Sequence, residues 1–286
     1  MNREATWHSP LAGHWYSADP AVLRAQIEDL LTAAAPQAGP SSAPRGLIVP
    51  HAGYAWSGGV AAAAYALVRG RPYQRVIVIG PSHRVHLPDQ VALPDFTRLT
   101  TPLGAIALDT ECIERLGAGP EVAGPPEAQR AGHSVQIQGP FLQVVLPAAR
   151  LTPLVAGQLS PGGAARIADR LQAEIGPDTL LVVSTDFTHY GPAFGYVPFR
   201  QDIPTRLREL DLAAFARLQA RDPAGFRSYI EQTGATICGR DPLTVLAHLL
   251  GAQDELRLLA YAQSGVMTQP NDEQSVSYLA AAWQTK

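Results

Sequence analysis

Residues 75–84 read RVIVIGPSHR, an apolar run that ends in a short polar cluster. The same arrangement recurs in residues 47–54, LIVPHAGY, and in residues 180–189, LLVVSTDFTH. Strands that are apolar on both faces are typical of parallel sheets, because helices cover both sides of such sheets. The three segments therefore predict three buried strands of one α/β sheet.

The rest of the chain supplies the helices that such a sheet needs. Asp19 and Pro20 indicate a helix start, since aspartate caps helices and proline suits the first turn. We expect one α/β domain, residues 1–286, with an open, mostly parallel or mixed sheet flanked by helices on both faces. Periodicity and loop signals predict helices from residue 20 and at 59–69, 109–116, 134–146, 161–174, 203–219, 222–232 and 241–250, strands at 151–156, 256–262 and 276–282, and irregular or antiparallel chain at 85–104.

Composition limits the classes of partner. The 286 residues are 46% hydrophobic and carry a formal net charge of −3, too small to attract nucleic acid or an anionic membrane. No apolar run reaches the roughly 20 residues that span a bilayer, and the N-terminal MNREATWHSP lacks the apolar stretch of a secretory signal. Two distant cysteines form neither a disulfide framework nor a zinc finger. We expect a soluble, cytoplasmic protein without nucleic-acid or membrane partners.

The polar clusters that follow the three strands indicate one shared site. Ligands of open α/β sheets bind beyond the carboxyl ends of the strands, so His51, His83, Asp186 and His189 should meet at one edge. A single histidine is more often a hydrogen-bonded structural residue. Histidines in the same place after three strands make coincidence a poor explanation, and we predict a joint site.

The two cysteines differ in their sequence surroundings. Cys238 lies in TICGRDP, just before a helix that Asp241 is expected to begin. Loop amides, the helix N-terminus and Arg240 would favour the thiolate of Cys238, the form that reacts and binds metals. Cys112 lies in a helical pattern and is predicted to be part of the core.

Eight blocks of sequence together resemble the Memo-like family, of the AmmeMemoRadiSam system protein B type. That family is related in fold to the class III extradiol ring-cleaving dioxygenases, so the resemblance implies the same α/β fold. Each block is short, and only their common order along nearly the whole chain is specific. They are HWYSAD (14–19), PHAGYAWSG (50–58), GPSHR (80–84), HSVQIQGPFL (133–142), STDFTHYG (184–191), TICGRDP (236–242), YAQSG (261–265) and SVSYLA (275–280).

The resemblance implies a metal site and its neighbours. His51, His83 and Cys238 match the metal ligands of the family, whereas Asp186 and His189 match residues that line the same pocket. In the related dioxygenases, the position of His189 resembles that of the acid/base histidine, and a glutamate stands where this chain has Cys238. Two imidazoles and one thiolate suit one divalent or redox metal ion, with iron or copper favoured and zinc also suitable.

One block departs from the family pattern. The family often has an acidic residue before the histidine of this block and a second one three residues after it. Here Gly132 and Gln136 occupy those positions around His133. The histidine is retained, but the acidic environment of that wall is missing.

Two functions from different classes fit these residues. The first is a metal-dependent oxidoreductase of the dioxygenase type, in which His189 is the general base and Asp186 orients its ring. The second is a non-enzymatic module that binds a peptide or protein in the same cleft and uses the metal for structure or redox. The side chains expected to line the substrate pocket in either case are Tyr54, Trp56, His133 and Arg240.

The expected partners follow from these two functions. They are a small aromatic substrate or a peptide, together with a radical-SAM protein that the resemblance implies. A cysteine hydrolase built on Cys238, His189 and Asp186 is a further alternative. It would leave His51 and His83 without a role.

Overall fold

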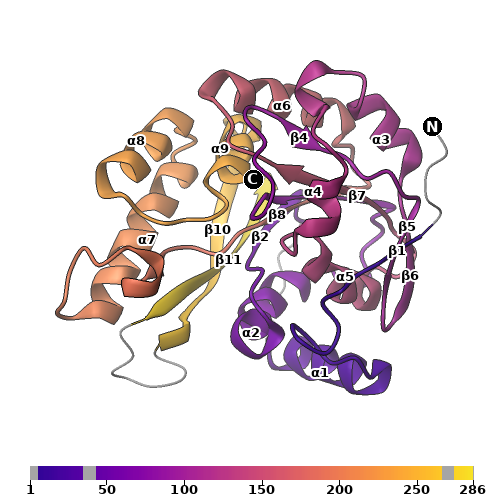
Figure 1. Ribbon diagram of the computed structural model, residues 1–286, viewed down its shortest axis with the longest axis horizontal. Helices are drawn as coiled ribbons and strands as arrows, with labels where there is room; N and C mark the ends of the chain where they lie inside the picture. Colours follow the sequence, from indigo (N-terminus) through magenta and orange to yellow (C-terminus); the bar gives the residue numbers. More distant parts are fainter. Residues whose placement is uncertain (1–5, 35–42, 266–273, 286) are drawn as a thin grey trace.

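The computed structural model describes residues 6–34, 43–265 and 274–285. Within those ranges a mixed sheet of eight strands forms the centre of the molecule (Figure 1). The strands follow the order β10 (Asp254–Gln263), β11 (Ser275–Thr285), β2 (Gly46–Val49), β8 (Thr179–Ser184), β3 (Arg75–Pro81), β7 (Arg150–Ala156) and β4 (Val91–Ala92), and β9 (His189–Tyr190) pairs with β11 beside this path.

The four central strands of this sheet are parallel. β2 pairs with β8, β8 with β3 and β3 with β7 in parallel, whereas β10, β11 and β4 are antiparallel to their neighbours. Val49 of β2 lies opposite Ser184 of β8, and Ile79 of β3 lies opposite Val183. The three strands therefore end at one edge of the sheet, and the loops that carry the histidines start there.

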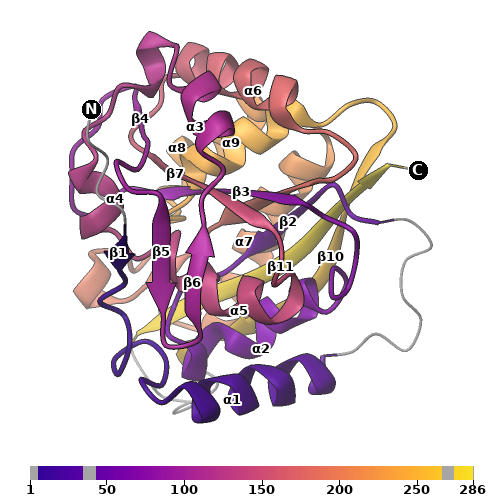
Figure 2. The same cartoon turned by 90° about the vertical axis from the view of Figure 1, so that its right-hand side faces the viewer.

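Alternate residues of the central strands point into two separate cores. Val76 and Val78 of β3 face one core, and Ile77 and Ile79 face the other, all of them at most 2% exposed. Figure 2 shows the helices in two layers with the sheet between them. The first layer contains α1 (Pro20–Ala33), α2 (Tyr54–Tyr65) and α5 (Gly139–Val145); the second contains α6 (Pro161–Glu174), α7 (Ile203–Gln219), α8 (Pro223–Thr233) and α9 (Arg240–Leu249).

Smaller elements complete the described part of the chain. A second sheet has three strands, in which β1 is parallel to β5 and β5 is antiparallel to β6. Its strands are β1 (Trp7–His8), β5 (Arg98–Thr101) and β6 (Gly104–Ala107); the remaining helices are α3 (Thr110–Leu116), α4 (Glu127–Ala131) and the 3-10 helices η1 (Pro120–Val122), η2 (Gln136–Gln138) and η3 (Pro192–Phe194).

The expected α/β architecture is confirmed, and the differences concern element ends. Asp19 caps α1 by accepting from two backbone N–H groups, as expected. The helix expected at 59–69 already begins at Tyr54, because the loop after β2 turns at Gly53 directly into the helix. The helix expected at 134–146 is split into η2 and α5 at Gly139, where Gly139 and Pro140 predict that it must start, kink or be interrupted.

Candidate metal centre

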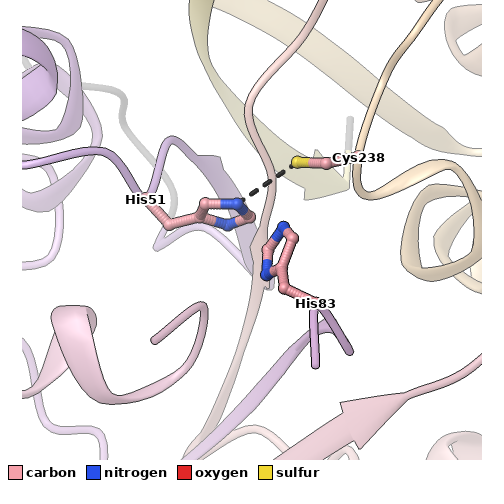
Figure 3. A group of neighbouring side chains, drawn as sticks. All are labelled: His51, His83 and Cys238. Atoms are coloured by element: carbon pink, nitrogen blue, oxygen red, sulfur yellow. Dashed lines mark hydrogen bonds between the residues drawn. The ribbon is translucent and has the colours of Figure 1, made fainter. Parts of the chain in front are cut away.

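The carboxyl edge of the parallel strands brings together the three residues matched to metal ligands. His51 lies two residues after β2, His83 lies two residues after β3, and Cys238 precedes α9 by two residues. Their ligand atoms all lie within 4.8 Å of one another, and no other such group of three occurs in the described ranges. Figure 3 shows both rings and the thiol turned toward a common point.

The geometry of these donors fits a transition metal ion. Cys238 Sγ lies 3.2 Å from His51 Nε2. A tetrahedral ion that binds nitrogen at about 2.0–2.1 Å and sulfur at about 2.3 Å would hold these two atoms about 3.5 Å apart. Two imidazoles and a thiolate are a borderline-soft set, which suits iron, copper or zinc rather than magnesium or calcium.

Burial and the neighbouring imidazoles keep the histidine side chains of the site neutral. Burial, and then the neighbouring His133, His83 and His189, lower the pKa of His51 well below 6.5. The pKa of His83 falls to about 4, and that of His133 falls to about 3, in both cases mainly because of burial. At neutral pH these rings therefore retain a lone pair that can bind a metal.

The protein alone does not favour the thiolate of Cys238. Burial raises the pKa of Cys238, and the nearby Asp186 carboxyl raises it further. The backbone N–H of Asp186, which lies 3.2 Å from the sulfur, lowers it by less. The expectation that Arg240 stabilises this thiolate is wrong, since its side chain is half exposed and lies beside Asp241. Ionisation of Cys238 at neutral pH would therefore need an added positive charge nearby, which a bound metal ion would supply.

This environment predicts how the two cysteines react. Iodoacetamide at about pH 8 should modify Cys238 more slowly than a free thiol, because little thiolate forms. Cys112 should react later still, because it is only 1% exposed, whereas Cys238 is partly exposed and can be reached by the reagent. Peptide mapping over time would measure both rates, and added Zn²⁺ should protect Cys238 alone. Earlier labelling of Cys112 would contradict this assignment.

Asp186 and His189 both reach the edge but do not pair. The Asp186 carboxylate accepts from the backbone N–H of His51 at 2.8 Å, and burial raises its pKa to about 7. The ring of His189 lies with Nδ1 3.1 Å from the carbonyl oxygen of Thr236. The prediction that Asp186 orients the ring of His189 is therefore wrong: Asp186 positions the loop of His51, and Thr236 holds His189.

His133 is the fourth imidazole of the cluster. Its ring stacks on His83 at 4.5 Å between centroids and on Trp15 at 4.2 Å, so it lies between these two side chains. Gln136, which replaces the acidic residue of the family pattern, donates to the carbonyls of Gln129 and Gly132. This wall of the site is consequently aromatic and neutral rather than acidic.

The other side chains predicted to line the pocket lie elsewhere. Tyr54 is 5% exposed, donates to the carbonyl of Ile137 and packs in the core, so the prediction that it forms a pocket wall is contradicted. Arg240 lies beside a small surface cavity on α8. Trp56 is 42% exposed on the first turn of α2.

Sequence reasoning missed several residues that hold the site. Ser184 and Gln138 contact each other and surround His51, and Thr236 bonds to His189 through both its side chain and its backbone. Ser184 and Thr236 are the first residues of the blocks STDFTH and TICGR. Their closeness in sequence to the expected site residues was the signal that could have pointed to them.

The fold and the site define a class of protein: a single α/β domain with a candidate mononuclear metal centre beyond the parallel strands. The sequence model of one family, described as Memo-like protein, matches residues 8–282. The chain belongs to this Memo-like family.

Known members of the family match over nearly the whole chain. The protein memo-1 homolog of Caenorhabditis elegans is 32% identical over 96% of this chain and 81% of its own length. A MEMO1 family protein of Methanothermobacter thermautotrophicus is 33% identical over 90% of this chain and 93% of its own length. The protein MEMO1 of Homo sapiens is 29% identical over 98% of both chains.

Two further findings concern one solved structure and the helices of this chain. The crystal structure of an uncharacterized protein of Escherichia coli K12 covers 83% of this chain and 98% of its own, with 15% identity and a TM-score of 0.48, a likeness too weak to carry an argument. In the described ranges, no helix has both the length and the apolar character needed to cross a membrane.

Proposed function

We propose that this protein holds one divalent or redox metal ion through His51, His83 and Cys238 and works as a metal-dependent oxidoreductase of the dioxygenase type. The observation that carries the proposal is the convergence of three ligand atoms within 4.8 Å. Three protein ligands leave coordination positions open, a feature of catalytic rather than structural metal sites. Although the ring of His83 is partly covered by His133, the residue as a whole is exposed, so the centre is reachable from solvent.

A small aromatic substrate suits the walls of this centre. The stack formed by Trp15, His133 and the ligand His83 gives this side of the centre an aromatic, uncharged surface. A bound iron or copper ion would supply Lewis acidity and redox chemistry there, lowering the pKa of water or of a phenolic oxygen. The choice of iron or copper over zinc rests on the expected chemistry and is part of the proposal.

His189 is the proposed general base. The carbonyl of Thr236 can only accept, so Nδ1 of His189 carries the hydrogen and Nε2 keeps its lone pair. Burial lowers the pKa of His189, so the ring is neutral and able to take a proton at neutral pH. Asp186 keeps the structural task of holding the His51 loop.

A peptide-binding module is the second candidate function. Trp56 is 42% exposed and Phe194, whose ring lies 5.2 Å from that of His189, is 40% exposed. Exposed aromatic side chains on the surface favour protein contacts. We also propose a radical-SAM protein as a partner, which the family resemblance supports. The proposed location is cytoplasmic.

Metal content and turnover of the wild-type protein test the proposal. Protein purified without chelators should contain about one transition metal ion per chain, measured by elemental analysis. Loaded with Fe²⁺ or Cu²⁺, it should consume oxygen in the presence of catechol-type substrates. Substoichiometric metal together with measurable affinity for peptides would favour the module instead.

A further inference from the structure

A buried chain of hydrogen bonds lies behind His51, on the side of the ring away from Cys238. Ser184, the last residue of β8, places its Oγ 3.1 Å from Nδ1 of His51. Gln138 of η2 places its Nε2 2.8 Å from the same Oγ. Both side chains are at most 1% exposed, so water does not compete for these bonds.

The hydrogen of the Ser184 hydroxyl already takes part in a hydrogen bond to another residue. This hydroxyl donates to the carbonyl oxygen of Ser134, which can only accept. The Ser184 oxygen must therefore be the acceptor in each of its other hydrogen bonds.

The amide of Gln138 has a single workable orientation. Its Nε2 lies 3.0 Å from the carbonyl oxygen of Pro50, which requires a donor, and its Oε1 accepts from the hydroxyl of Tyr65 at 2.9 Å. Turning the amide over would bring two oxygens together at Pro50. Gln138 consequently donates to Ser184 and uses one of the two lone pairs of that oxygen.

The last lone pair of Ser184 determines the tautomer of His51. It faces Nδ1, so Nδ1 must carry the hydrogen, and a neutral imidazole then has a bare Nε2. That Nε2 is the atom 3.2 Å from Cys238 Sγ. We infer that Ser184 and Gln138 are positioning residues that fix His51 as the Nδ1–H tautomer and present its Nε2 to the metal. The metal part of this inference rests on the proposed function, whereas the tautomer does not.

A serine hydroxyl needs such a network of partners before it can fix the tautomer of a histidine. The outer partner of a metal-binding histidine is commonly a carboxylate, a carbonyl or water. A hydroxyl can donate as well as accept, and a donating Ser184 would favour the wrong tautomer with hydrogen on Nε2. Ser134 and Gln138 together remove that choice, because one takes the hydroxyl hydrogen and the other occupies the spare lone pair.

Nuclear magnetic resonance on the metal-free wild-type protein tests the tautomer directly. Long-range proton–nitrogen correlations of the His51 ring should show hydrogen on Nδ1 and a bare Nε2. In Ser184→Ala the ring should shift to the Nε2–H form or to a mixture of tautomers. A wild-type ring with hydrogen on Nε2 would overturn the inference, whatever the variants do.

Zinc affinity tests the consequence for the metal. In competition titrations with Zn²⁺ alone, Ser184→Ala should bind about 10–100-fold more weakly than wild type, the usual effect of losing an outer partner. Ser277→Ala is the matched control, since Ser277 of β11 is 0% exposed and its hydroxyl accepts from Tyr261 at 3.1 Å rather than from a ligand residue. It should bind Zn²⁺ as wild type does.

The outcomes separate the inference from the proposed function. Affinity of Ser184→Ala within about threefold of wild type, or equal weakening in both serine variants, would overturn the positioning role. A wild-type protein that binds none of Zn²⁺, Fe²⁺ and Cu²⁺ would instead refute the proposed function. The tautomer measured in the metal-free protein would still decide the assignment of Ser184 and Gln138.

Discussion

Cys238→Ser is expected to leave the purified protein with little or no bound metal. Structural zinc sites gain about 10–16 kcal/mol from about four ligands, so one thiolate contributes roughly 3 kcal/mol, or at least ~100-fold in affinity. Serine does not ionise at neutral pH and offers no comparable ligand. Elemental analysis and a Zn²⁺ competition titration would measure the loss.

Cys112→Ser provides a matched control for this experiment. It makes the same atomic change at a site on α3 that is 1% exposed and outside the group of ligand atoms. The control should keep the wild-type metal content per folded chain, even if its melting temperature falls. Wild-type metal content in Cys238→Ser, or equal loss in both variants, would remove Cys238 from the ligand set.

The sequence was sufficient to predict the layers of the fold. The runs in β2, β3 and β8 are apolar on both faces, and only a sheet covered on both sides buries such strands. The edge position of the histidines followed from the same reasoning, because parallel strands direct the loops after them to one side. The start of α2 was harder to predict, since it depends on a local turn at Gly53, whereas the start of α5 at Gly139 agrees with the break that Gly139 and Pro140 predict.

The finer arrangement of the site depends on contacts between distant segments. Asp186 and His189 are three residues apart, yet the carboxylate contacts His51, which lies 135 positions from Asp186 in sequence. Spacing alone therefore suggested a pair that the chain does not form. The tautomer of His51 likewise depends on Ser134 and Gln138, from a segment that no periodicity links to β8.

His189→Ala is expected to abolish turnover while leaving the metal in place. The ring belongs to β9 and is held by Thr236, and His189 is absent from the group of close ligand atoms. A general base contributes typically ~10²–10⁴-fold to rate, so the turnover number should fall by that factor. Metal analysis, thermal melting and an assay with the substrate found for wild type would measure the three effects separately.

The pattern of losses then discriminates between the possible roles of His189. Loss of metal together with activity would make His189 a fourth ligand, and loss of stability alone would make it structural. Partial recovery of the rate on adding free imidazole would support proton transfer, because the small molecule replaces the missing base. His248→Ala, on the opposite end of α9 from Cys238, serves as control and should retain metal and rate. A His189→Ala variant that melts lower, keeps its metal and turns over substrate like wild type would rule out the general-base role.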